Sequence, residues 1–105
     1  MGKSVKYLYE TGQVWKEINH ESDKYEEQHI SYYESGVVME RANYTDGERD
    51  GQYIFYYETE TIRDTGTYKD GKMDGEWVRY SEGGTRFDED IWENGECIKK
   101  CEQYD

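Results

Sequence analysis

A turn sequence recurs every 24 residues along this 105-residue chain, and this period constrains the fold more than any single residue does. Tyr9-Glu10-Thr11-Gly12 returns as Tyr33-Glu34-Ser35-Gly36, as Tyr57-Glu58-Thr59-Glu60 and as Ser81-Glu82-Gly83-Gly84. Half a period later a second turn signal recurs: Tyr44-Thr45-Asp46-Gly47, Tyr68-Lys69-Asp70-Gly71 and Trp92-Glu93-Asn94-Gly95. Two interleaved turn signals with one period indicate a repeat protein, whose units bury their apolar faces by stacking on one another. A short stack of this kind usually forms a surface rather than a catalytic cleft.

Each period is expected to form a strand–turn–strand hairpin. Residues 38–44 are expected to form a strand, Asp46-Gly47 a tight turn, and residues 51–57 a strongly β-prone strand. The predicted fold is all-β, a single antiparallel β-hairpin meander built from about four 24-residue units, with eight or nine short strands. The whole chain, residues 1–105, is expected to be one domain. The expected units are residues 7–31, 32–55, 56–79 and 80–103.

The period also places similar side chains at equivalent positions. Four ladders are predicted. They are formed by Tyr32, Tyr56 and Tyr80; by Tyr53 and Trp77, with His29 before and Cys101 after them; by Val14, Val38 and Ile62, broken by Arg86; and by Tyr44, Tyr68 and Trp92, with His20 before them. Cross-strand contacts of this kind contribute roughly 0.2–1 kcal/mol each. Most of the aromatic residues are therefore expected to be structural, and those on an uncovered face would bind a partner. The sequence leaves open which face is covered.

Two units match a known repeat at glycine, acidic and aromatic positions together: Tyr44–Tyr53 and Tyr68–Trp77. They resemble MORN repeats, and most closely the bacterial variant form, written roughly Y-x-N/D-G-K-x-D-G-x-W-x-x-Y-Y-x-N-G. The resemblance covers residues 32 to 95 and extends weakly over residues 7 to 31, with departures at Ser22, Glu60 and Arg86. It implies a β-hairpin meander and a non-enzymatic module.

The family's functions are diverse. Bacterial proteins of the variant class are often labelled as antitoxins, other MORN proteins act as scaffolds, and lipid binding has been proposed for them. Lipid binding is disfavoured here, because anionic bilayers attract Lys and Arg rather than a protein with a net charge of −12.

Acidic residues outnumber basic ones by 25 to 13, and they are unevenly distributed. Residues 73–98 hold eight acids against two bases, and residues 87–96 hold five acids and no base. Such a surface repels nucleic acid and membranes and speeds encounter with a basic partner. The plainer interpretation is that the charge keeps a thin sheet soluble.

Location and redox state are inferred from what the sequence lacks. No apolar stretch approaches the roughly 20 residues of a membrane span, and no signal-peptide pattern follows Met1, so a cytoplasmic protein is expected. In a strand, the Cα atoms of Cys97 and Cys101 would lie about 13 Å apart, beyond disulfide reach. In a helix they could approach, but a reducing cytosol would still favour free thiols.

No catalytic or metal-binding motif stands out. The two histidines, His20 and His29, fall at aromatic positions without a nucleophile motif. Residues 46–51 mimic the start of a calcium loop, but Tyr57 occupies the place of its closing glutamate, so a hairpin turn is expected there. Two cysteines fall short of a zinc site, no glycine loop fits a phosphate, and basic patches are absent. We therefore expect no enzyme activity, no cofactor, no metal and no direct binding of nucleic acid.

Two functions are consistent with these features. The first is inhibition of a basic, nucleic-acid-handling protein such as a nuclease, as by an antitoxin, an immunity protein or a phage-encoded inhibitor of a host nuclease defence (an anti-CRISPR), with acids in place of phosphates. The expected contact residues are Asp88, Glu89, Asp90, Trp92, Glu93 and Glu96, with Tyr53, Tyr56 and Trp77 as candidate anchors. The alternative is a structural scaffold that self-associates through open sheet edges, as a homo-oligomer.

Overall fold

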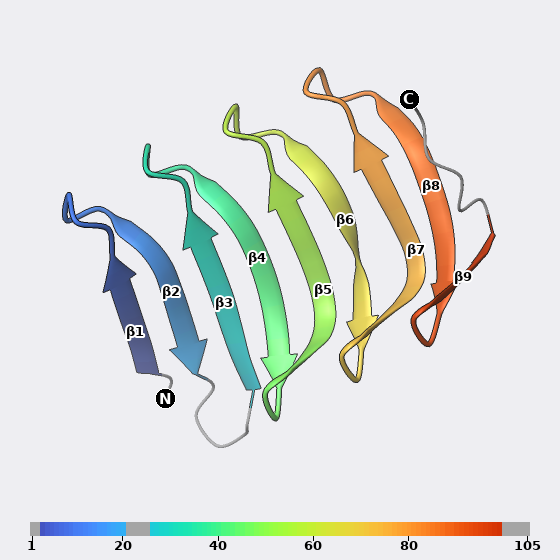
Figure 1. The fold of residues 1–105 in the computed structure, drawn as a ribbon, viewed down its shortest axis with the longest axis horizontal. Coiled ribbons are helices and arrows are strands. Elements are labelled where there is room, and N and C mark those ends of the chain that lie inside the picture. The colour runs from blue at the N-terminus through green and yellow to red at the C-terminus, as the bar shows by residue number, and fades with distance from the viewer. Residues whose placement is uncertain (1–2, 21–25, 100–105) are drawn as a thin grey trace.

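The described part of the chain forms one antiparallel sheet of nine strands in sequential order (Figure 1). This computed structural model describes residues 3–20 and 26–99. The predicted all-β meander is confirmed, and no helix occurs in these residues. The strands are β1 (Lys3–Leu8), β2 (Val14–His20), β3 (Glu26–Tyr32), β4 (Val38–Thr45), β5 (Glu48–Tyr56), β6 (Ile62–Lys69), β7 (Lys72–Tyr80), β8 (Arg86–Glu93) and β9 (Glu96–Lys99). Ser22, one of the departures from the repeat, and the part of the last expected unit beyond residue 99 lie outside the described residues.

Two kinds of turn alternate along the sheet, as the period predicts. At the Asp46-Gly47 turn both residues have positive φ, of 54° and 81°, and the turns at residues 70–71 and 94–95 repeat these values closely. Two successive positive φ angles match the twist of the adjoining strands, and they favour the Asp-Gly and Asn-Gly pairs found here. At the other end of the hairpins, Gly12, Gly36 and Gly84 have φ near 90°, while Glu60 adopts a φ of 79° in the equivalent place.

The sheet is a single layer, and no described element covers either of its faces. Its extents of 39 × 32 × 19 Å describe a thin, curved body. Residues that are direct partners in the register lie on the same face. Ala42 and Tyr53 therefore share one face, which we call the aromatic face, whereas Ile30, Ile54 and Val78 lie on the opposite face.

Few side chains in this sheet are buried. The buried apolar residues among those described are Ile30, Ala42 and Val78, and Asp64 is the buried charged residue. Because apolar burial is small, hydrogen bonds and ring contacts between neighbouring hairpins carry an unusual share of the stability. No described helix is long and apolar enough to cross a lipid bilayer.

Tyrosine hydroxyls join successive hairpins at the turn that recurs every 24 residues. The hydroxyls of Tyr9 and Tyr33 donate to the backbone carbonyls of Tyr32 and Tyr56, at 2.8 and 2.6 Å. Tyr57 donates in the same way to the carbonyl of Tyr80, at 2.8 Å. The first residue of the repeated turn is therefore a tyrosine because its ring spans two strands and its hydroxyl reaches the next hairpin. Ser81, at the following position, is too short to do this.

Removing one of these hydroxyls should cost measurable stability. We expect Tyr33→Phe to lower the free energy of unfolding by about 1 kcal/mol, because the carbonyl of Tyr56 loses its donor while the ring stays in place. Urea unfolding followed by tryptophan fluorescence measures this change. Tyr7→Phe is the matched control, because the Tyr7 ring is exposed and Tyr7 does not occupy the repeated turn position whose hydroxyl reaches the next hairpin, so its change should be near neutral. Equal losses in both variants would show that the hydroxyl bond is not the cause.

Candidate binding face

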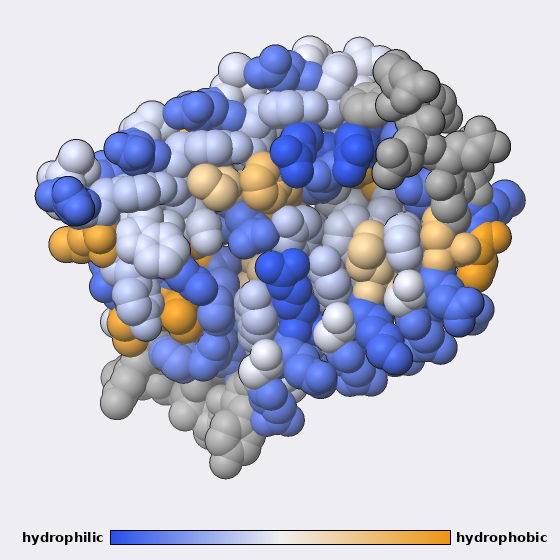
Figure 2. All heavy atoms as spheres, in the orientation of Figure 1, coloured by the Kyte–Doolittle hydropathy of each residue, from blue (hydrophilic) through white to orange (hydrophobic). Residues whose placement is uncertain are grey.

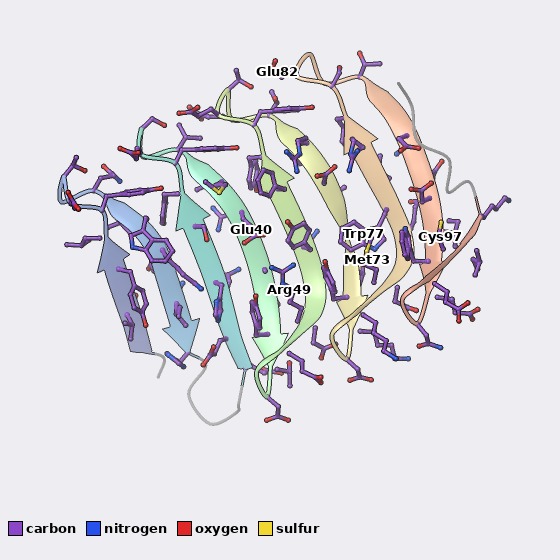
Figure 3. All side chains as sticks on the ribbon, in the orientation of Figure 1. Glu40, Arg49, Met73, Trp77, Glu82 and Cys97 are labelled. Atoms are coloured by element: carbon purple, nitrogen blue, oxygen red, sulfur yellow. The ribbon has the colours of Figure 1, made fainter. Side chains whose placement is uncertain are left out.

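Three aromatic rings from neighbouring strands form the centre of the aromatic face (Figure 3). Tyr53 on β5 lies 5.5 Å from the Trp77 ring on β7, measured between centroids. Tyr68 on β6 packs edge-on between them, 5.6 Å from Tyr53 and 5.2 Å from Trp77. Trp77 also donates its indole N–H to the carbonyl of Thr67 at 3.1 Å. The rings therefore form a continuous, partly exposed apolar surface over β5 to β7.

Arg49 links this ring cluster to β4. Its guanidinium carbon lies 5.3 Å from the ring centroids of Tyr53 and Tyr68, and 5.9 Å from that of Tyr44. Its Nε donates to the Tyr44 hydroxyl at 3.0 Å and its Nη1 to the Tyr68 hydroxyl at 3.3 Å. Glu40 balances the charge, with its carboxylate 3.8 Å from Nη2. Figure 3 shows Glu40, Arg49 and Trp77 laid across the middle of the sheet.

The same glutamate accepts a hydrogen bond from Tyr53, at 2.8 Å. Burial of the Tyr53 hydroxyl, and secondly its hydrogen bond to the Glu40 carboxylate, raise the pKa of Tyr53 well above 10. The Tyr53 hydroxyl is therefore a neutral donor at any physiological pH. The Glu40–Tyr53 hydrogen bond therefore keeps the same donor over this pH range.

Asp64 is the buried carboxylate of the aromatic face, and two arginines satisfy it. The Nε of Arg79 donates to its Oδ1 at 2.8 Å, and the Nε of Arg63 to its Oδ2 at 2.9 Å. Arg63 also stacks on Phe55, with its guanidinium carbon 4.1 Å from the ring centroid. A buried carboxylate is tolerated when paired in this way. The central acids of this face are thus neutralised within the chain.

The expected contact residues do not all lie on one face. Trp77 lies directly across from Asp90, Arg79 from Asp88, and Gly75 from Trp92, which places Asp88, Asp90 and Trp92 on the aromatic face with Tyr53 and Trp77. Glu89 lies across from Val78, and Tyr56 is two residues beyond Ile54 on β5, so Glu89 and Tyr56 are on the opposite face. Glu93 and Glu96 are exposed partners across the turn at residues 94–95. The structure therefore brings together five of the nine residues.

On the opposite face, two carboxyl groups meet. A hydrogen bond with Glu89, and then the charge of Glu89, raise the pKa of the exposed Glu76 above its usual value of 4.5. A folded-state pKa that is raised means that protonation favours the fold. Stability from this pair is present at low pH and is lost as pH rises through the raised pKa of Glu76.

We therefore expect Glu76→Gln to raise the thermal unfolding midpoint at pH 7, where both carboxyls of the native protein are ionised and repel each other. The gain should vanish near about pH 3, where the native pair is protonated. Calorimetry at the two pH values measures it, with Glu82→Gln, an exposed glutamate in a turn, as the control. A gain of the same size at both pH values would contradict this account of the pair.

A known protein family matches two segments of the chain. The model of the family described as MORN repeat variant matches residues 28–46 and 49–70. The chain therefore contains repeats of the MORN repeat variant family. The matched residues span β3–β4 and β5–β6, one hairpin each, with the Tyr44, Tyr53 and Tyr68 rings among them. Residues 71–95, which the sequence pattern also assigns to MORN repeats, lie outside the two matched segments. A search of curated proteins found no match to the chain.

MORN repeats build binding and scaffold modules, and the structure explains the repeat's acidic position. Within the calcium-like segment, Asp50 Oδ1 accepts from the backbone N–H of Asp70, at 3.5 Å. At the equivalent position of the next repeat, Asp74 Oδ1 accepts from the backbone N–H of Asn94, at 3.3 Å. Each aspartate thus links its hairpin to the turn of the next one. The predicted hairpin turn at residues 46–47 is confirmed. No group of three or more metal-ligating residues is placed to hold a metal in the described ranges.

The histidines of this MORN protein take part in side-chain packing. His29 stacks on Tyr44, with centroids 4.0 Å apart. Glu27 lies between both histidines, 2.9 Å from His29 Nε2 and 3.1 Å from His20 Nδ1. Their interpretation as replaced aromatic positions agrees with these contacts.

The cysteine expectation was wrong for Cys97, which is disulfide-bonded in the structure. The argument against a disulfide assumed that a regular strand or helix continues through the segment. The distance estimate needs Cys97 and Cys101 to lie in one regular strand, and β9 is described only as far as Lys99. Cys101 lies outside the described residues.

Two features of the MORN surface were missed from the sequence. Arg49 connects the aromatic ladders, and no ladder contained it. The exposed glutamates of the repeated turn, Glu10, Glu34, Glu58 and Glu82, form an acidic rim along one end of the hairpins; Figure 3 labels Glu82 there. This rim could have been predicted from the sequence, because each glutamate directly follows the first residue of the turn that recurs every 24 residues. The exposed acidic charge therefore extends along this rim and is not confined to residues 88–96.

Proposed function

We propose that this protein is a non-enzymatic binding protein that inhibits a basic, nucleic-acid-handling partner by covering the partner's nucleic-acid surface. Antitoxins, immunity proteins and phage-encoded inhibitors of nuclease defences, including anti-CRISPR proteins, are the classes that fit. The proposal includes a cytoplasmic location and no cofactor. The contact surface would be the aromatic face toward β8, with Asp88, Asp90, Trp92, Tyr53 and Trp77.

The observation that carries the proposal is the pairing of Trp77 with Asp90 across β7 and β8. Trp77 belongs to the ring cluster with Tyr53 and Tyr68, so an apolar centre directly adjoins an acidic border. Binding energy concentrates where aromatic residues are desolvated, while surrounding charges guide the encounter. A basic partner would place its apolar contacts on the rings and its Lys and Arg toward the acids.

The distribution of charge supports a partner that ordinarily binds phosphates. Glu10, Glu34, Glu58 and Glu82 recur at every second strand, which corresponds to about 10 Å between neighbours. With a net charge of −12, the protein attracts extended basic surfaces over more than one contact point. Nucleic-acid-handling proteins present such surfaces.

Two adjacent carboxylates on opposite faces provide a matched test. We expect Asp88→Lys to weaken binding to the partner and to flatten its salt dependence, whereas Glu89→Lys makes the same charge change on the opposite face and should have a smaller effect. The wild-type chain and both variants serve as baits in a host lysate, and mass spectrometry quantifies the recovered proteins. Affinity for the recovered partner is then measured across a salt series, with circular dichroism to check that both variants fold.

Three results would reject the proposal. One is an affinity and salt dependence unchanged by charge reversal at Asp88 and Asp90. Another is an equal loss in the Asp88→Lys and Glu89→Lys variants. The third is the recovery of partners without a basic surface.

A structural scaffold that self-associates is the second candidate. The open edge at β1 favours it, because an uncovered edge strand can pair with another strand. Light scattering coupled to size exclusion tests this function, and a strict monomer removes it.

A further inference from the structure

Four of the six exposed large apolar residues in the described part of the chain lie at the β1 edge of the sheet. Val5, Tyr7 and Leu8 of β1 are 42 %, 44 % and 56 % exposed, and Trp15 on β2 is 38 % exposed. Figure 2 shows apolar residues gathered at this edge. The Tyr7 and Trp15 rings lie 5.8 Å apart, so they form one patch rather than scattered side chains. Contiguous exposed apolar patches of this kind mark association sites.

This edge is also the least acidic part of the sheet. β1 contains no Asp or Glu, whereas every other described strand contains at least one. Its Lys6 lies directly across from Glu17, which also accepts from the Ser4 hydroxyl at 3.1 Å. The edge therefore presents apolar side chains on a strand that holds two lysines, Lys3 and Lys6, and of these Lys6 lies across from an acid.

The backbone of β1 offers the second requirement for association. Among the described strands, β1 pairs with β2 alone. Its outer N–H and C=O groups form a row that can pair with another strand. A register shift between Tyr7 and Leu8 marks a bulge in the β1–β2 pair, and a bulge brings Trp15 to the side of Tyr7.

We infer that two copies of this chain associate by antiparallel pairing of their β1 strands around a twofold axis. Two sheets joined in this way form one continuous sheet, and both copies present the same face on the same side. The twofold axis is then flanked by the apolar side chains of Val5, Tyr7 and Trp15 from each copy, and these side chains contact one another across it. Since copies with a charge of −12 repel each other, the acid-free strand is where they meet at least cost. A twofold contact uses both β1 edges and so closes at the dimer.

This inference is independent of the proposed inhibitory function, because it uses the edge of the sheet farthest from β8. The two interactions should also respond oppositely to salt. Raising the salt concentration from about 0.05 M to about 0.5 M weakens an attraction between opposite charges, but strengthens an apolar contact between two acidic copies. Failure of one interaction therefore leaves the other measurable.

A lysine placed on the edge tests the pairing. Sedimentation velocity of the full chain over a range of concentrations should show a dimer, and Val5→Lys should weaken it about tenfold or more, because lysine on an edge strand opposes strand pairing. Ile62→Lys is the matched control: Ile62 is 37 % exposed on β6, away from the edge, and its replacement should leave the dimer unchanged. Circular dichroism checks that both variants fold.

Hydrogen exchange of the wild-type chain gives a second test that needs no variant. Backbone amides of β1 should exchange more slowly as the protein concentration rises, while those of β5 should not change. A monomer at all concentrations would overturn the inference, as would equal weakening by Val5→Lys and Ile62→Lys. It would also be overturned if β1 became protected only when a polyglutamate peptide is added, which would identify an acidic strand as the occupant.

Discussion

Gly66→Ala should destabilise this protein by about 3 kcal/mol, which for a thin sheet of this size is a large share of the total. The Trp77 indole packs directly on Gly66, and a Cβ there would overlap its Cδ2 and Cε2 atoms. The clash is steric, because Gly66 is not among the glycines with positive φ. The indole would have to move, and its contacts with Tyr53 and Tyr68 would be lost together with the hydrogen bond to Thr67.

Two further variants isolate this cause. Gly83→Ala is the control, since a Cβ at Gly83 meets nothing closer than Ser81 Oγ at 3.9 Å, and its effect should be near zero. Trp77→Leu should reduce the cost of Gly66→Ala when the two changes are combined, because the overlapping ring is gone. Urea unfolding followed by far-ultraviolet circular dichroism measures the wild-type protein, the three single variants and the double variant. Additive costs in the double variant would refute the clash.

Arg49→Met should lower the free energy of unfolding by about 2–3 kcal/mol. The change removes the cation from between the Tyr44, Tyr53 and Tyr68 rings and takes two hydrogen bonds from tyrosine hydroxyls. It also leaves the part-buried Glu40 carboxylate with Tyr53 as its hydrogen-bond donor. Unfolding in urea gives the stability, and near-ultraviolet circular dichroism reports the packing of the rings.

Arg49→Lys is the matched control for charge. Lysine keeps the cation but loses the planar fork that reaches two hydroxyls, so about half of the loss should remain. If Arg49→Lys lowered the free energy of unfolding as much as Arg49→Met, the loss would come from the planar guanidinium group and not from the charge. If neither variant were destabilised, the ring cluster would not depend on Arg49.

The general fold could be predicted because turn residues report backbone conformation directly. The Asp-Gly and Asn-Gly pairs at residues 46–47, 70–71 and 94–95 adopt the two positive φ angles that favour such pairs. The recurrence of tyrosine at 24-residue spacing was equally visible. Its reason was not, because a hydroxyl that reaches a carbonyl 23 residues ahead depends on how the turn aims the ring.

The distribution of side chains between the two faces was harder to predict, because bulges interrupt simple alternation. The register shifts between Phe55 and Tyr56, where Arg63 is the extra residue, and Arg63 lies over Phe55 beside Asp64. Strict alternation would send Arg63 and Asp64 to opposite faces. The ladders of Tyr53 with Trp77 and of Tyr44 with Tyr68 also interlock through ring contacts instead of running separately.

One signal in the sequence could have located the ring contacts. Ile18 lies across from His29, and Ala42 across from Tyr53, while Gly66 lies beneath Trp77. The ring becomes larger as its cross-strand neighbour becomes smaller. The spacing within each pair is 11 residues, so this complementarity can be read from the period once the strands are paired.

The tyrosine hydroxyl bonds have a consequence for how the chain folds and opens. Each hydroxyl bond reaches 23 residues, and each strand pairs with its sequence neighbours, so the contacts of the sheet are local in sequence. Low contact order of this kind favours fast folding that can nucleate in any hairpin and spread outward like a zipper. Local unfolding should begin at the two edges of the sheet and move inward. Backbone amides around β4 to β7 should therefore be the most protected against hydrogen exchange, and protection should decline towards both edges.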